Sequence, residues 1–248
     1  MIGSTQRILT KLDDYLHKND YDGAERHLRY WLSEVEASDD VHTRLTLYNE
    51  LMGLYRKLGR EQDALACVEA ALELMDRWSL GEQVGGATTL LNCATVYKAF
   101  GKAKDALPLF ERARTVYEGE LEPTDSRLGG LYNNMGLALV DLGRFHEAKE
   151  LYRAAISIME QTENGALEVA ITYLNLARAA EQELGAVDAD ATVQCYLDKA
   201  QALLDGHGNK DGYYAFVCEK CASVFGYYGH FLYQKDLEER ARRIYAHA

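Results

Sequence analysis

A short break in the helical pattern recurs along this chain at an almost constant interval. The residues at the breaks are Asn19, Gly59, Gly101, Gly143, Gly185 and, in a looser form, Gly229. Successive breaks lie 40, 42, 42, 42 and 44 residues apart, and an alanine follows five residues after each of the first four. A fixed period of this length is typical of repeat proteins, in which one supersecondary unit stacks on the next.

Each break separates two segments with the periodicity of an amphipathic helix. Before Gly143, apolar and small residues fall at steps of three or four, at Tyr132, Met135, Gly136, Leu139 and Leu142. The segment after Gly143 repeats the pattern, and a glycine at the end of a helix allows the left-handed conformation that stops it. The repeating unit is therefore predicted to be a helix–turn–helix hairpin. Gly136 and Ala148 leave room for its two helices to approach closely.

Some segments resemble a known family, the tetratricopeptide repeat. Residues 87–92 and 131–136 resemble the motif of its first helix, and residues 105–110 resemble that of its second helix, including Pro108 near the helix start. The 42-residue spacing is similar to the longer repeat of the kinesin-light-chain type. The resemblance extends over residues 4–204.

This resemblance implies an all-α fold, a right-handed α-solenoid (superhelix) of about six tetratricopeptide-like hairpins. We expect a single tetratricopeptide-repeat domain over residues 1–248, with the last hairpin a divergent cap because terminal repeats must close the core on one side. After Gly185 an acidic, alanine-rich stretch replaces the usual turn, so we expect the fifth hairpin to open wider. The expected hairpins cover residues 4–36, 41–78, 82–118, 124–161, 165–204 and 211–246.

Three asparagines are candidates for ligand binding. In the tetratricopeptide family the first helices line a concave groove, and the resemblance implies that extended peptides bind there. Asn92, Asn134 and Asn175 are predicted to occupy equivalent positions of three first helices. A carboxamide both donates to and accepts from a peptide backbone. The same amides could instead hydrogen-bond neighbouring helices, and the sequence leaves both roles open.

Four cations lie further along the same helices, in otherwise acidic segments: Arg56, Lys57, Lys98 and Arg178. They could clamp a carboxylate of the ligand, since arginine presents a planar fork of donors to that group. Their simpler role is to place positive charge at helix C-termini, where the helix dipole favours it.

The C-terminal segment is a second candidate surface. Nine aromatic residues lie between Tyr213 and Tyr245. Most are expected to pack in the core, but tyrosine is also frequent in interfaces. Self-association or docking through this aromatic hairpin is therefore a second possibility.

No catalytic, metal or cofactor site is predicted. Cys218 and Cys221 have the Cys-x-x-Cys spacing, but no second pair supplies the four ligands of a structural zinc, and buried thiols on a helix fit better. No histidine lies at metal spacing with another ligand, and no serine lies in a nucleophile elbow. The chain is not predicted to be an enzyme.

The net charge of −12 argues against a nucleic-acid partner, which needs a basic surface. Residues 61–125 hold 6 Lys and Arg against 12 Asp and Glu, which favours a basic or neutral partner. No run of 18 apolar residues predicts a membrane span, and the N-terminal residues lack the apolar core of a signal peptide. Five cysteines, an odd number, indicate a reducing cytoplasm.

These observations favour a cytoplasmic adaptor or scaffold that binds a peptide or partner protein in its concave groove. The alternative is a receptor or regulator of the bacterial signalling-peptide type, whose curvature changes when a short peptide binds. An enzyme with an unrecognised site is the third and least favoured hypothesis.

Overall fold

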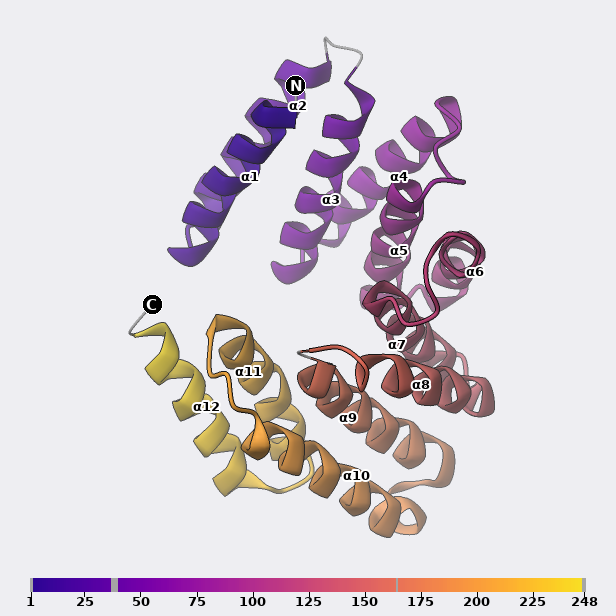
Figure 1. Ribbon diagram of the computed structural model, residues 1–248, viewed down its shortest axis with the longest axis vertical. Coiled ribbons are helices and arrows are strands. Elements are labelled where there is room, and N and C mark those ends of the chain that lie inside the picture. The colour runs from indigo at the N-terminus through magenta and orange to yellow at the C-terminus, as the bar shows by residue number, and fades with distance from the viewer. Residues whose placement is uncertain (1, 37–39, 164, 247–248) are drawn as a thin grey trace. The chain divides into compact units, whose positions relative to one another are not determined.

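The computed structural model describes residues 2–36, 40–163 and 165–246, and over these residues it contains helices and turns and no strand (Figure 1). The prediction of an all-α fold is confirmed. Within the described ranges, twelve helices pair in sequence into six hairpins, as predicted. The chain divides into two compact units, unit 1 (residues 1–120) and unit 2 (residues 121–248).

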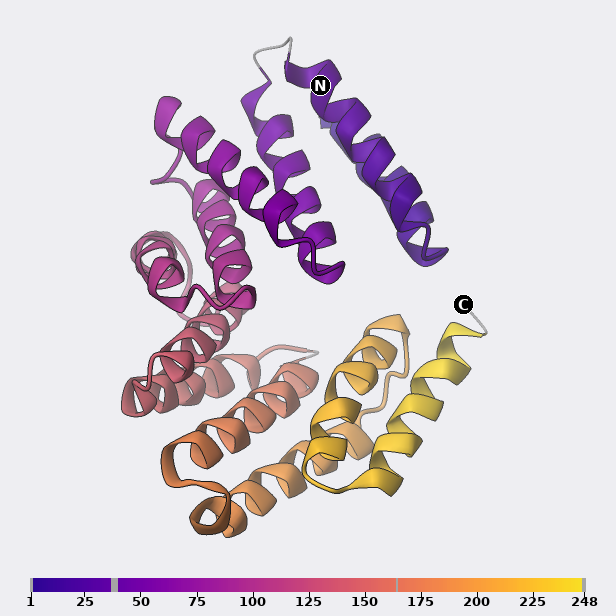
Figure 2. The same ribbon diagram turned by 180° about the vertical axis from the view of Figure 1, so that it is seen from behind.

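Unit 1 contains three hairpins, in which each first helix is followed by its antiparallel second helix (Figures 1 and 2). The second hairpin joins the other two, because α3 packs on α2 on one side and on α5 on the other. The helices are α1 (Ile2–His17), α2 (Tyr21–Glu36), α3 (Val41–Lys57), α4 (Glu61–Arg77), α5 (Val84–Ala99) and α6 (Ala103–Glu120).

Unit 2 contains the other three hairpins, and its central helix is α9, which contacts α7, α8, α10 and α11. In the final helix, α12, Leu237 and Ala241 are the residues buried against the rest of the unit. The helices are α7 (Ser126–Asp141), α8 (Phe145–Met159), α9 (Gly165–Leu184), α10 (Ala186–Gly206), α11 (Gly212–Tyr227) and α12 (Phe231–Tyr245).

The recurring breaks are helix ends with one left-handed residue. The five glycines have φ between 68° and 84°, and Asn19 has φ 53°. In the turn at Gly59, the amide of Arg60 donates to the carbonyl of Tyr55 at 2.9 Å and the amide of Gly59 donates to Arg56 at 3.3 Å. This pair of bonds is the Schellman motif, which satisfies the last carbonyls of a helix. The turns at Asn19, Gly101, Gly143 and Gly229 have the same bonds.

The turn at Gly185 is different, and the prediction of a wider fifth hairpin was wrong. Helix α9 ends at Leu184 and α10 begins at Ala186, so Gly185 alone separates them. Its amide donates to the carbonyl of Glu181 at 2.8 Å and its φ is 84°. The alanine-rich stretch that follows is part of α10, because alanine is the best helix former.

The core of unit 2 accounts for part of the aromatic C-terminal segment. Tyr214 and Phe225 of α11 are fully buried among residues of α9, α10 and α12. The ring of Tyr233 packs on that of Phe225 at 4.7 Å, edge to face. Packing was the default role predicted for these aromatics, and it holds for these three.

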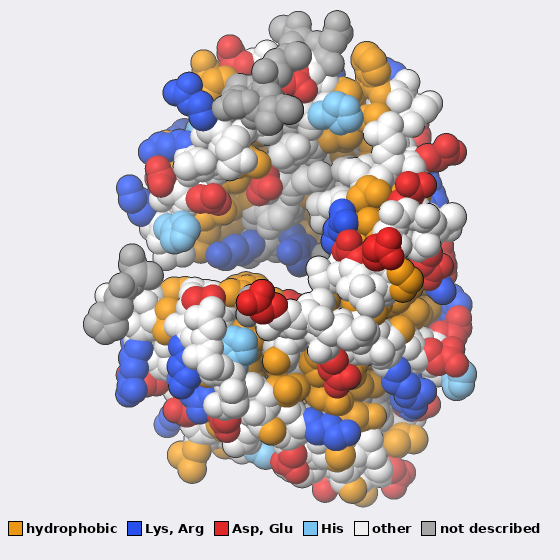
Figure 3. Space-filling model, in the orientation of Figure 1, with side chains coloured by type: hydrophobic (Ala, Val, Ile, Leu, Met, Phe, Trp, Pro, Cys, Tyr) orange, Lys and Arg blue, Asp and Glu red, His pale blue; other side chains and the backbone are white. Residues whose placement is uncertain are grey.

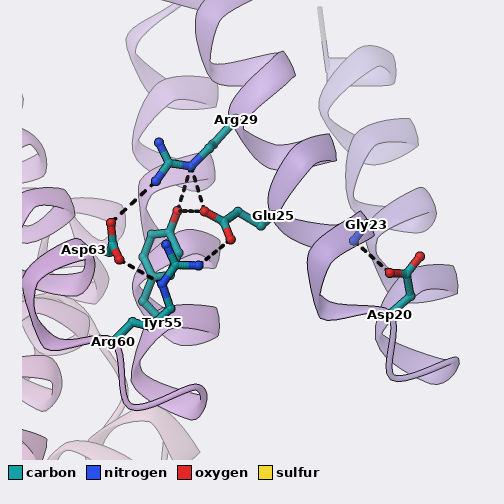
Figure 4. Close-up of polar contacts among 7 residues, drawn as sticks. All are labelled: Asp20, Gly23, Glu25, Arg29, Tyr55, Arg60 and Asp63. Atoms are coloured by element: carbon teal, nitrogen blue, oxygen red, sulfur yellow. Dashed lines mark hydrogen bonds and ion pairs between the residues drawn. The ribbon is translucent and has the colours of Figure 1, made fainter.

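A polar cluster joins the first hairpin to the second (Figure 4). Glu25 of α2 accepts hydrogen bonds from Tyr55 and Arg29, each at 2.9 Å, and from Arg60 at the turn before α4. Arg60 also pairs with Asp63 at 2.8 Å. Burial alone would raise the pKa of Glu25, but its hydrogen bonds with Arg60, Tyr55 and Arg29 outweigh burial and lower that pKa below 4.5.

This cluster predicts a pH-dependent stability in unit 1. Because the folded-state pKa of Glu25 is lowered, its stabilising contribution is present above about pH 4.5 and is lost as the pH falls through the folded-state value. We expect Glu25→Gln to lower the free energy of unfolding at pH 7, and the difference from the wild type to shrink toward pH 3. Urea titrations at several pH values measure this; Glu69→Gln on the exposed side of α4 is the control and should leave the profile unchanged.

The close approach of α7 and α8 gives a second prediction. A Cβ at Gly136 would lie 2.6 Å from Cε1 of the buried Tyr152 ring, whereas a Cβ at Gly130 on the same helix would meet nothing within 4 Å. Gly136→Ala should therefore lower the free energy of unfolding by about 1–3 kcal/mol through overpacking. Gly130→Ala should raise it by up to about 1 kcal/mol, since alanine is the better helix former. Equal effects in chemical denaturation would contradict the packing assigned to Gly136.

Candidate functional site

The first helices of unit 2, α7, α9 and α11, lie side by side and form what we call the first-helix face. On one side of α9, the amide of Asn175 donates to the Asn133 side-chain oxygen at 2.9 Å, and the Thr172 hydroxyl donates to the same oxygen at 3.4 Å. Three residues further on, Arg178 pairs with Asp141 of α7 at 3.4 Å. The hydrogen bond between Asn175 and Asn133 sets the register between α7 and α9, and the weaker Arg178–Asp141 pair lies alongside it.

On the other side of α9, carboxylates accept hydrogen bonds from tyrosines of α11. Tyr213 donates to Glu168. Tyr227 and Tyr228 donate to the two oxygens of Glu181 at 3.2 and 3.0 Å. The charge of Glu181 raises the pKa of Tyr227, whereas burial and then the hydrogen bond to Glu181 raise that of Tyr228. Both hydroxyls therefore remain protonated donors at neutral pH.

A cleft of about 630 Å³ opens between α9 and α11 at this end of the face. One wall is α9, with Arg178 as its cation, and the other is α11. The lining residues are Arg178, Glu181, Gln182, Ala186, Ser223, Val224, Tyr227 and Tyr228. The cleft thus combines a guanidinium, an amide, a hydroxyl and aromatic rings, which are the groups that bind peptide main chain and side chains.

Three aromatic side chains of α11 remain open to solvent along this face. Tyr213 is 41%, Phe216 50% and Tyr227 71% exposed. They stand three and eleven residues apart, so they fall on one side of the helix, and the rings of Tyr213 and Phe216 stack at 6.3 Å. Exposed aromatic rings in a row are typical of interaction surfaces rather than of a cap.

A second hollow, of about 420 Å³, lies between the α8–α9 turn and α10. Tyr173 and Tyr196 stack there at 6.0 Å, and Lys199 lies 5.2 Å from the centre of the Tyr173 ring. Figure 3 shows hydrophobic side chains gathered over α9 and α10 on this side of unit 2. Because Lys199 already lies over the tyrosine rings, it is less available to a ligand than Arg178 of the cleft is.

The predicted asparagines have different surroundings. Asn92 on α5 is half-buried and makes no side-chain hydrogen bond within the described part of the chain, and Asn134 donates to the Gly130 carbonyl of its own helix at 2.8 Å. Asn92 and Asn134 lie nine residues before their glycine and Asn175 lies ten, so the predicted equivalence was wrong by one residue. The position equivalent to Asn175 is Asn133, which sequence reasoning missed although the two are 42 residues apart.

The predicted cations are divided between the two units. Arg56 and Lys57 are exposed at the end of α3, with Lys57 4.8 Å from the centre of the Tyr21 ring. Lys98 is half-buried near the end of α5. Arg178 is the one predicted cation that the structure places in the cleft of unit 2.

The paired cysteines are buried in α11, as expected for core thiols. Cys218 is 0% and Cys221 1% exposed. Burial raises the pKa of both, that of Cys221 to about 12, so they remain protonated and unreactive at neutral pH. Within the described ranges, no three His, Cys, Asp or Glu side chains are grouped so that they could hold a metal ion. No helix in those ranges has the length and apolarity needed to cross a membrane.

Comparison with known proteins identifies the family. The tetratricopeptide repeat model matches residues 43–119 and 127–189, more than half of the chain. The chain belongs to the tetratricopeptide repeat family. Its repeats are of the kinesin-light-chain type: protein KINESIN LIGHT CHAIN-RELATED 2 of Arabidopsis thaliana is 25% identical over 126 residues, 49% of this chain and 19% of that protein. The chain thus matches about a fifth of the length of this relative.

Solved structures share the fold. BtubC (BKLC) from P. vanneervenii has a TM-score of 0.68 and 22% identity, and the match covers 82% of each chain. A Rap protein in complex with competence and sporulation factor has a TM-score of 0.54 and 13% identity, over 94% of this chain and 72% of that one. At these identities the likeness shows the fold alone.

The tetratricopeptide register predicts which asparagine stabilises the stack. Asn133→Ala would leave the Asn175 amide without its acceptor, whereas Thr172 would keep its 2.8 Å hydrogen bond to the Glu168 carbonyl, so we expect the free energy of unfolding to fall by about 1–3 kcal/mol. Asn92→Ala should change it by less than about 0.5 kcal/mol. Chemical denaturation of both variants measures the difference, and a loss at Asn92 as large as at Asn133 would contradict this assignment.

Proposed function

We propose that this protein is an interaction scaffold that binds an extended peptide segment of a partner protein along the first-helix face of unit 2. Membership of the tetratricopeptide repeat family supports the scaffold role in general. The observation that carries the specific proposal is the cleft between α9 and α11, which joins Arg178 to the exposed Tyr227.

The side chains that line the cleft can bind a peptide through non-covalent contacts alone. The contact of Arg178 with Asp141 is long, 3.4 Å, and both side chains are partly exposed, so this pair contributes under about 1 kcal/mol. The guanidinium can therefore turn toward a carboxylate of the ligand. Gln182 and Ser223 offer hydrogen bonds to a peptide main chain, and Tyr227 offers a ring for an apolar side chain. Binding of this kind forms no covalent bond.

We extend the proposal to the first helices of unit 1. There Asn92 and Lys98 on α5, and Arg56 and Lys57 at the end of α3, supply amides and cations of the same kinds. In this proposal the whole chain, residues 1–248, acts as one tetratricopeptide-repeat domain.

All five cysteines are free thiols, four of them buried, which supports a reducing cytoplasmic setting.

Affinity capture from a native cell extract tests the cleft. We expect Arg178→Glu and Tyr227→Ala each to reduce recovery of the captured partner at least about tenfold, since each removes one of the two anchors of the site. The matched control is Arg153→Glu, which makes the same charge change on the exposed side of the second helix α8. Quantitative mass spectrometry of the bound fraction gives the readout, with thermal unfolding to show that each variant is folded. The same partners in the same amounts from all four proteins would exclude this cleft.

The Rap protein complex supports a second candidate, a signalling-peptide receptor whose solenoid changes curvature on binding. In that case a short synthetic peptide, and not a folded protein, should shift the small-angle scattering profile of the whole chain. A profile that is unchanged at saturating peptide would leave only the scaffold.

A further inference from the structure

Five hairpin turns contain a glycine. A lysine or arginine follows the glycine in the first three of these turns, but not in the last two. Directly after Gly59, Gly101 and Gly143 stand Arg60, Lys102 and Arg144. Each pairs with a carboxylate of its own unit: Arg60 with Asp63, Lys102 with Glu61 and Arg144 with Glu147. After Gly185 and Gly229 the same position holds Ala186 and His230.

Bulky apolar side chains are instead exposed at these two turns. Val187 and Phe231 each follow their glycine by two residues, and Leu232 follows Phe231. Val187 is 88% and Leu232 86% exposed, the two highest values for a large hydrophobic side chain in the described part of the chain, and Phe231 is 63% exposed. Leaving such side chains in water gains nothing for folding, because no apolar surface is buried.

The two turns are neighbours. Ala186 of the first turn and Tyr228 of the second line the same cleft. Nε2 of His230 lies 3.2 Å from the side-chain oxygen of Gln194 in α10. We call the surface made by Val187, Phe231 and Leu232 the turn edge.

On the α10 side the charge beside the turn edge is negative, whereas the exposed Lys235 stands four residues after Phe231 on α12. Residues 179–198 contain Glu181, Glu183, Asp188, Asp190 and Asp198 and no lysine or arginine. Asp188 and Asp190 are exposed and have no ion pair within the described ranges. Asp188 lies in the first turn of α10, where the helix dipole favours it, but Asp190 lies beyond that turn. A second copy that met this edge with its own turn edge would set Asp188 and Asp190 against the same carboxylates.

We propose that the turn edge is a docking surface for an amphipathic basic segment of a partner protein, one whose apolar side chains are flanked by lysine or arginine. The apolar side chains of that segment cover Val187, Phe231 and Leu232, and its cations face Asp188 and Asp190. This surface borders the first-helix cleft of the proposed function but shares none of its lining residues, so the two would contact different parts of a partner.

A binding experiment with a defined probe tests this inference. The probe is a fluorescent peptide of about 14 residues, ~21 Å long as a helix, with leucine on one face and lysine on the other. A second probe has glutamate in place of every lysine. Fluorescence anisotropy of the full chain should show binding of the lysine probe and none of the glutamate probe. The variant Val187→Ser with Leu232→Ser should weaken binding of the lysine probe at least about tenfold, with the net charge unchanged.

Two controls separate this site from general attraction to an acidic protein. Leu58→Ser, at the exposed turn between α3 and α4, should leave the affinity unchanged. Asp188→Asn with Asp190→Asn should weaken binding and reduce its dependence on salt.

Equal affinity of the wild type and the Val187→Ser, Leu232→Ser variant would overturn the proposal. So would a dimer in sedimentation velocity that Leu232→Ser dissolves, because the edge would then belong to a second copy. The cleft variant Arg178→Glu keeps the turn edge intact, so failure of the proposed function leaves this test unaffected.

Discussion

The left-handed residue at the end of each first helix is the constraint on which the rest of this structure depends. A positive φ at Gly59, Gly101, Gly143 or Gly229 lets two amides turn back to the last carbonyls of the helix, so the helix ends at one defined residue and the next begins after a short turn. An L side chain is strained there, which explains why glycine recurs. Since each break fixes where two helices end and start, the spacing of the breaks fixes the register of neighbouring hairpins.

Register in turn determines which side chains meet between hairpins. Residues about one period apart face each other: Asn49 donates to Thr89 at 3.0 Å, and Asn175 donates to Asn133 at 2.9 Å. Both bonds join one first helix to the next. Breaking either bond would leave a buried or half-buried polar atom without its partner, so these contacts penalise any slip of one helix along its neighbour. The first-helix face of unit 2 is therefore held in place from within, and its outer side chains need not contribute to the stack.

The amino-acid sequence was sufficient for features that depend on local chemistry. The breaks, the helices between them and the close approach at Gly136 could all be predicted, because glycine spacing and apolar periodicity act within one hairpin. The contact of Glu181 with Tyr227 and Tyr228 could not, since it depends on how α9 and α11 pack across a repeat of 44 residues rather than 42. The shift from Asn134 to Asn133 was missed for a related reason: adjacent asparagines look alike in sequence, but only one points at α9.

Departures from the repeat are where the two proposals lie, and there is a physical reason for this. A position that packs against a neighbouring helix in each repeat must hold a side chain that fits there. Tyr152, whose ring packs on Gly136, is an example. Phe216, Tyr227, Val187 and Leu232 are large and exposed, so the core of unit 2 does not require them. Exposed apolar side chains that gather in one patch mark interaction surfaces. In a scaffold built from similar hairpins, a partner is therefore recognised by side chains that the packing of the stack does not require. In unit 2 these side chains lie on α11 and on the last two turns.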